Sequence, residues 1–143
     1  MKLSHIVTAF LILATFQVSA EPASNEWKKR YQVITNEVCS KVKGECLVRF
    51  SAYKKDKAGL PVNNLHFIAV PGKVVVVERH GPSWGNGKDY KSAVRTNPTW
   101  LDLAVIANDM IHKTGDRRHI YLEDCEVVSI KNGIKYVELY MGS

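Results

Sequence analysis

The chain has 143 residues, with 20 Lys and Arg against 14 Asp and Glu, and a formal net charge of +6. This length favours a single domain, and the basic residues stand in short groups, which excludes a long cationic tail. Such a surface is typical of a solvated protein and also suits an anionic partner.

The first 20 residues match a secretory signal peptide. Lys2 precedes an apolar run from Ile6 to Phe16, and small residues follow at positions 18–20. The run is shorter than the roughly 20 residues of a membrane-spanning helix, which favours cleavage over permanent anchoring. We therefore expect a signal peptide over residues 1–20 and a single small α+β domain over residues 21–143. The protein is then exported, periplasmic or secreted, with no integral membrane segment after cleavage.

An amphipathic helix is expected next, because apolar residues recur at helical spacing and a glycine follows as a stop signal. These apolar residues are Trp27, Tyr31, Ile34, Val38 and Val42. A strand is expected over Cys46–Tyr53, which is rich in apolar and aromatic residues, with a polar loop after it. The mature part therefore begins with a helix and a strand joined by a short turn.

The three cysteines, Cys39, Cys46 and Cys125, permit three alternative single disulfides in an oxidising compartment. Cys39 and Cys46 are the favoured pair, because they flank the turn at Gly44 and their Cβ atoms can approach there. Closing so short a loop is worth roughly 2–3 kcal/mol of stability through the unfolded state. Cys125 is then expected to be a free thiol that packs as a small apolar residue.

A β-hairpin is expected around Pro71-Gly72, a dipeptide that suits the centre of a type II turn. Its strands would cover Leu65–Val70 and Lys73–Arg79. The unbroken apolar run Val74–Val77 indicates a strand that is covered on both faces and is central in its sheet.

A second helix is expected to begin near Pro98 and to end at Gly115. Thr99 and Asp102 have the spacing of an imperfect capping box, and proline suits the first helical turn. The apolar stripe of this helix is wide enough to imply burial on more than one side.

A closing hairpin is expected at Asn132-Gly133, the strongest short signal for a tight turn, between strands over His119–Ile130 and Ile134–Met141. This turn sets Val128 opposite Val137. The order of elements is thus helix, three strands, loop, helix and two strands. It predicts an α+β fold with a mostly antiparallel sheet of about five strands packed with two helices.

The loop from His80 to Asn97 is the candidate binding region, because it is long, rich in glycine and contains an aromatic residue with little local cover. Trp84 is the expected anchor, and its alternative is a core side chain folded back onto the sheet. The expected charged surround of the anchor is Arg79, Lys88, Lys91 and Arg95. These residues suit an anionic or glycan-type envelope component, or a protein.

No histidine or cysteine spacing matches a metal site, so no metal or other cofactor is expected. The sharpest catalytic arrangement lies near the end of the second helix and combines Asp109, His112, Asp116, Arg117, Arg118 and His119. Two histidines beside a cation suit acid–base chemistry on a phosphodiester. The structural alternative pairs Asp109 with Lys113 across one helical turn and leaves the arginines solvated.

No complete catalytic signature is present, so we expect a non-enzymatic exported binding or envelope-associated protein. Two other classes stay open. One is a small secreted hydrolase, nuclease-like, that uses His112 and His119 as acid and base. The other is a secreted toxin or effector, since a signal peptide specifies departure from the cytoplasm and not the final destination.

Overall fold

The computed structural model describes residues 23–79 and 85–143. The predicted signal peptide and Trp84 therefore lie outside the described residues. In chain order the elements are α1 (Ala23–Lys41), β1 (Arg49–Phe50), β2 (Lys54–Lys55), β3 (Pro61–Val62), β4 (Lys73–Glu78), β5 (Tyr90–Lys91), β6 (Arg95–Thr96), α2 (Trp100–Thr114), β7 (Tyr121–Lys131) and β8 (Ile134–Gly142).

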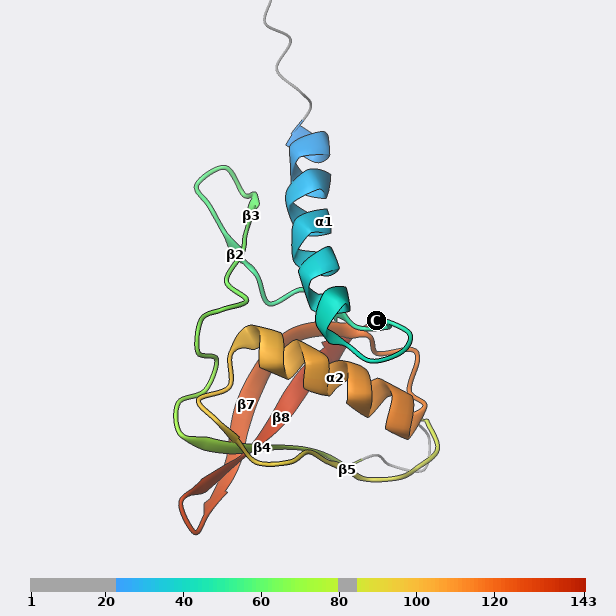
Figure 1. Cartoon of the computed structure of the whole chain (residues 1–143), viewed down its shortest axis with the longest axis vertical. Helices are drawn as coiled ribbons and strands as arrows, with labels where there is room; N and C mark the ends of the chain where they lie inside the picture. The colour runs from blue at the N-terminus through green and yellow to red at the C-terminus, as the bar shows by residue number, and fades with distance from the viewer. Residues whose placement is uncertain (1–22, 80–84) are drawn as a thin grey trace, which may run out of the picture.

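The main sheet is mixed and has the strand order β1-β7-β8-β4-β5, with β6 also paired to β4. The pairs β7–β8, β4–β5 and β4–β6 are antiparallel, whereas β1–β7 and β4–β8 are parallel. α2 lies across one face of this sheet, and the small β2–β3 hairpin stands beside α1 (Figure 1). The predicted α+β class is confirmed, and the sheet is mostly antiparallel as expected, with two parallel pairs that the sequence did not indicate.

The hairpin predicted around Pro71-Gly72 does not form. Residues 65–70 instead run along the start of α2, where the Ala69 N–H donates to the Pro98 carbonyl oxygen at 2.9 Å. β4 has β8 on one side and β5 and β6 on the other, so no edge of β4 is left for the preceding segment. Val74–Val76 are accordingly buried, as expected for a central strand.

α2 is capped at Thr99 and ends at Gly115, as predicted, but it begins at Trp100, so Pro98 precedes the cap and does not lie in the first helical turn. The Thr99 hydroxyl accepts the Asp102 N–H at 3.2 Å, and the Asp102 carboxylate accepts the Thr99 N–H at 2.8 Å. This reciprocal capping box satisfies two N–H groups that the first turn leaves open. Gly115 ends the helix with a φ of 72°, which glycine adopts at little cost. The buried apolar side chains of α2 that enter the core are Leu103, Ala104, Ile106, Ala107, Met110 and Ile111.

The β7–β8 hairpin turns at Asn132-Gly133, as predicted. Its register differs from the prediction, because Val137 lies opposite Val127 and not opposite Val128. The pairing shifts by one residue between Val127 and Ser129, which is the signature of a β-bulge. The extra residue, Val128, is left 44% exposed.

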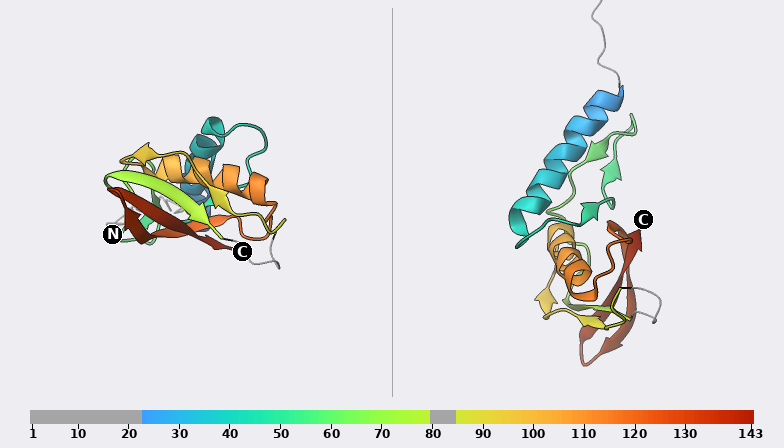
Figure 2. Two further views of the ribbon diagram at one scale, coloured as in Figure 1. Left: turned by 90° about the horizontal axis from the view of Figure 1, so that it is seen from below. Right: turned by 90° about the vertical axis from the view of Figure 1, so that its right-hand side faces the viewer.

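α1 is anchored to the rest of the protein mainly at its C-terminal half. Ile34 and Val38 are each 1% exposed there, whereas the first half of the helix extends away from the sheet alongside β2 and β3 (Figure 2). Trp27 stacks on Tyr31 with ring centroids 4.8 Å apart, and Tyr53 meets both rings edge-on. Aromatic packing thus supports the part of α1 that the main core does not reach.

Candidate functional site

A hollow of about 530 Å³ lies between the C-terminal end of α1, β5, β6 and α2, and we call it the α1–α2 groove. It brings together residues from both sets of candidates, since Lys91 and Arg95 line it beside Asp109 and His112. The remaining cationic residues of its lining are Lys41, Lys43 and Lys113, and its apolar residues are Val42, Ala93, Val105 and Ile106.

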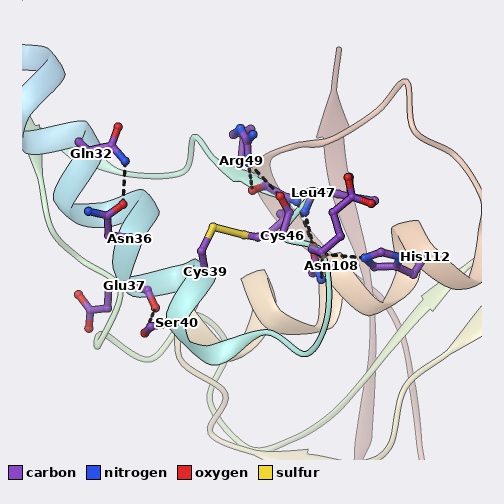
Figure 3. The surroundings of a disulfide bond; sticks show 12 residues. Gln32, Asn36, Glu37, Cys39, Ser40, Cys46, Leu47, Arg49, Asn108 and His112 are labelled. Carbon is purple, nitrogen blue, oxygen red and sulfur yellow. Dashed lines mark hydrogen bonds between the residues drawn. A yellow bond between two sulfur atoms is a disulfide. The ribbon is translucent and has the colours of Figure 1, made fainter.

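A disulfide holds one wall of the groove. Cys39 in the last turn of α1 is bonded to Cys46, the pair that the sequence favours (Figure 3). Gly44 has a φ of 76°, a conformation that glycine adopts readily and other residues rarely do. Lys41 and Lys43 lie inside the loop that the disulfide closes. The covalent ring therefore restrains the backbone that carries both lysines to the groove.

Asn108 ties this loop to α2. Its Oδ1 accepts the N–H groups of Leu47 at 2.8 Å and Val48 at 3.1 Å, and its Nδ2 donates to the Glu45 carbonyl oxygen at 3.2 Å (Figure 3). The side chain is buried within an otherwise apolar helix face. A buried amide with several partners fixes the relative position of the segments it joins, so Asn108 sets the distance between the two walls.

His112 lies one helical turn after Asn108 and binds the same segment. Its Nε2 donates to the Glu45 carbonyl oxygen at 2.7 Å, and because a carbonyl only accepts, this nitrogen carries the proton. The Arg117 guanidinium lies 3.5 Å from the Glu45 carboxylate. Two of the candidate catalytic residues therefore meet at Glu45, where they brace the disulfide loop.

Tyr90, Asp109 and Lys113 form a polar cluster in the groove. The Tyr90 hydroxyl donates to Asp109 Oδ2 at 2.8 Å, and Lys113 Nζ lies 2.9 Å from the same oxygen. Burial raises the pKa of Tyr90 far above its ordinary value, and the Asp109 carboxylate raises it further. The structural alternative for Asp109, an ion pair with Lys113, is thus present, and the charge of this carboxylate is balanced within the protein.

Three cations of the groove have no such partner. Lys41, Lys43 and Arg95 form no salt bridge with any residue in the described ranges 23–79 and 85–143. All three are exposed. The groove therefore has a net positive charge that is available to a ligand.

The predicted binding residues do not form one patch. Arg95 lines the α1–α2 groove, whereas Arg79 lines a second hollow of about 500 Å³ on the other side of β5. Lys91 borders both, but its ammonium group lies 5.6 Å from the centroid of the Tyr136 ring in the second hollow. Lys88 lines neither hollow, and its N–H donates to Asn86 Oδ1 at 3.0 Å.

His119 is bound to Asp116 at the end of the α2–β7 connection. His119 Nδ1 donates to Asp116 Oδ2 at 2.8 Å. Burial raises the pKa of Asp116, but the hydrogen bonds from His119 and from the Arg118 N–H outweigh it, and the net shift is downward. His112 and His119 thus bind different groups, the Glu45 carbonyl oxygen and the Asp116 carboxylate.

The sequence reasoning missed several site residues, among them Lys41, Lys43, Tyr90 and Asn108. The two lysines lie far from β6 in the chain, and only the fold brings them to Arg95. Their signal was their position on either side of Val42, between two cysteines expected to pair. The signal for Asn108 was a polar residue set among the apolar residues of the second helix.

Cys125 is the free cysteine and is half-buried against the core. Burial, with a smaller contribution from Asp124, raises the pKa of its thiol to about 11. Little of the nucleophilic thiolate is therefore present at neutral pH. This environment fits the packing role predicted for Cys125.

Comparisons with protein-family models, with curated proteins and with solved structures find no match. Within the described residues, no group of three or more His, Cys, Asp and Glu side chains is placed to hold a metal ion. No helix in that part of the chain is long and apolar enough to cross a membrane. A functional inference for this protein therefore depends on its own residues.

Proposed function

We propose that the protein is an exported, non-enzymatic binding protein that takes an anionic glycan of the cell envelope in the α1–α2 groove. The observation that carries this proposal is the charge imbalance of the groove. Lys41, Lys43 and Arg95 form no salt bridge among the described residues, whereas Asp109 is neutralised by Lys113. A phosphate, sulfate or carboxylate among three cations gains favourable Coulomb energy from each, about 1 kcal/mol per pair in water-like surroundings.

The rest of the lining supports a glycan as the body that bears the anionic group. Val42, Ala93 and Ile106 offer apolar patches between the charges, and Ser92 and His112 offer polar groups. Sugar rings have both apolar faces and hydroxyl edges, so they match a mixed lining of this kind. The disulfide and Asn108 hold the two walls in place, which reduces the entropy lost on binding.

Export is supported by the pattern of the first 20 residues and by the Cys39–Cys46 disulfide, since such bonds persist in oxidising compartments. Cell fractionation followed by N-terminal sequencing tests this part of the proposal. The expected product lies in the periplasmic or secreted fraction and begins at Glu21. Retention of the full-length chain in the cytoplasm would contradict it.

Calorimetric titration with a sulfated oligosaccharide and with its desulfated form tests the groove. We expect binding of the sulfated form only, with an affinity that falls as salt is added. Replacing two groove cations, Lys43→Glu with Arg95→Glu, should weaken binding by at least about tenfold, which corresponds to roughly 1.4 kcal/mol.

The matched control reverses two exposed lysines outside the groove, Lys28→Glu with Lys57→Glu. This control makes the same change in net charge, so it separates a local site from general attraction by a basic protein. Equal loss of binding in both double variants would place the anion elsewhere, and equal binding of the neutral sugar would remove charge as the basis of recognition.

The hydrolase alternative has one supporting observation, the carboxylate-oriented imidazole of His119. An aspartate that accepts from Nδ1 orients the imidazole and stabilises its protonated form, as in hydrolase triads. The alternative predicts turnover of RNA, DNA or peptidoglycan that disappears when His112 and His119 are both replaced by alanine. Turnover of this kind in the wild-type protein would displace the binding proposal.

A further inference from the structure

The outer edge of β7 is unpaired for most of its length. β8 pairs with β7 on one side from end to end, but β1 pairs on the other side only with Tyr121 and Leu122. Within the described residues, no strand adjoins β7 on that side from Glu123 to Lys131. An edge of this kind offers backbone N–H and C=O groups to a further strand.

The side chains along this edge are arranged in three zones. Carboxylates stand at its start, at Asp124 and Glu126, and an ammonium group stands at its end, at Lys131. Between the charged ends are the exposed apolar side chains of Val127 (40%), Val128 (44%) and Ile130 (64%). Soluble proteins normally protect edge strands with charge or cover, so a bare apolar centre indicates a surface that a partner covers.

We propose that β7 pairs antiparallel with β7 of a second copy of this chain, so that two sheets join into one across a two-fold axis. Asp124 and Lys131 lie at equal distances along the strand from the midpoint between Val127 and Val128. Antiparallel pairing about this midpoint sets each Asp124 opposite Lys131 of the other copy. Opposite charges meet at both ends of the interface, and the apolar side chains gather at its centre.

The irregularity of β7 favours a second copy over an unrelated strand. The register shift between Val127 and Ser129 lies at the proposed two-fold axis. In a symmetric dimer the same irregularity occurs in both strands at the same place, so the strands keep their pairing on each side of it. A regular strand of another protein would lose its register at this point, since a bulge sets two residues against one.

The pairing covers about eight residues of each chain, so the interface is small and the dimer is weak. Its formation therefore depends on protein concentration. The α1–α2 groove lies beside β5 at the other end of the strand order and stays open in this arrangement. The dimer is thus independent of the proposed anion binding, and either proposal can fail without the other.

Sedimentation equilibrium of the protein, expressed from its full coding sequence, tests this inference. The average mass should rise towards twice the monomer mass between low micromolar and millimolar concentrations. Asp124→Lys alone and Lys131→Asp alone each set like charges opposite one another, so each variant should stay monomeric. An equimolar mixture of these two variants should dimerise again, because the new charges are complementary between the two chains.

Val94→Lys and Lys57→Glu are the controls, since both residues are exposed and lie outside β7. Both control variants should dimerise as the wild-type protein does. A wild-type protein that is monomeric at millimolar concentration overturns the inference. A dimer that Asp124→Lys alone and Lys131→Asp alone leave intact also overturns it, as does a dimer that the control variants abolish to the same extent. The inference is overturned as well if the equimolar mixture of the two variants stays monomeric while each variant retains the wild-type circular dichroism spectrum.

Discussion

The two faces of the main sheet differ in what covers them. On the face that α2 covers, Leu103 and Ile111 pack into the core with almost no exposure. The buried amide of Asn108 joins the walls of the groove there through three hydrogen bonds. On the other face no helix in the described residues covers the sheet (Figure 2), and Tyr136 lies under two ammonium groups. The covered face supplies most of the stability, and the open face supplies charged groups in contact with water.

A cavity on the covered face should have the largest effect. Leu103 has no exposed surface, so Leu103→Ala removes buried apolar atoms and leaves a void beneath α2. We expect the free energy of unfolding in urea to fall by about 2–5 kcal/mol. Val94→Ala, at a side chain that is 50% exposed, is the control and should change it by less than about 0.5 kcal/mol. Similar losses of unfolding free energy in Leu103→Ala and Val94→Ala would contradict the inference that the covered face supplies most of the stability.

Removal of the buried charge of Asp116 beside α2 should have an intermediate and pH-dependent effect on the free energy of unfolding. The pKa of Asp116 lies below its ordinary value of 3.8 in the folded protein. The ionised carboxylate therefore stabilises the fold fully above pH 3.8, and this stabilisation is lost as the pH falls through the lower folded value. We expect Asp116→Asn to cost about 1.5–3 kcal/mol at neutral pH, the usual effect of losing hydrogen bonds to a charged group.

The pH profile separates this charge effect from a simple loss of packing. The difference in unfolding free energy between wild type and Asp116→Asn should shrink in acid, because the wild-type carboxylate becomes protonated there. A difference that is constant from neutral pH down into the acid range would show that ionisation of Asp116 does not contribute.

A change on the open face should have the smallest effect. Lys91 Nζ and Lys131 Nζ lie 5.6 Å and 5.8 Å from the centroid of the Tyr136 ring. Tyr136→Leu keeps an apolar side chain and removes the ring, so we expect a loss of about 0.5–1 kcal/mol in thermal or urea unfolding. Tyr136→Phe keeps the ring and should behave as wild type. A loss from Tyr136→Leu as large as that from Leu103→Ala would show that the open face is part of the core.

Local signals predicted the parts of the fold that depend on a few neighbouring residues. The capping box at Thr99, the turn at Asn132-Gly133 and the pairing of Cys39 with Cys46 each involve short sequence separations. The residue types needed for these features, a small hydroxyl, a glycine and two thiols, have few other roles at such spacing. Their geometry therefore follows from the sequence with little contribution from tertiary packing.

The same local signals did not predict how strands that are distant in the sequence pair with one another. The run Val74–Val76 indicates a central strand, but nothing in it specifies β8 as a parallel neighbour. The register of β7 changes because of a bulge at Val128, and apolar alternation does not reveal a single inserted residue. In the candidate site, Lys91 and Arg95 were predicted from one loop, whereas Lys41 and Lys43 join Arg95 only through the packing of α1 against α2.

The parallel pairing of β4 with β8 also governs when the sheet can form. Val74 pairs with Lys135, which follows 61 positions later in the chain, and β8 lies between β4 and β7. The central place in the sheet is thus taken by the last strand in chain order, and β4 has no parallel neighbour until that strand has been synthesised. Contacts between such distant residues slow folding. The main sheet of this chain therefore cannot be completed before its last strand is available.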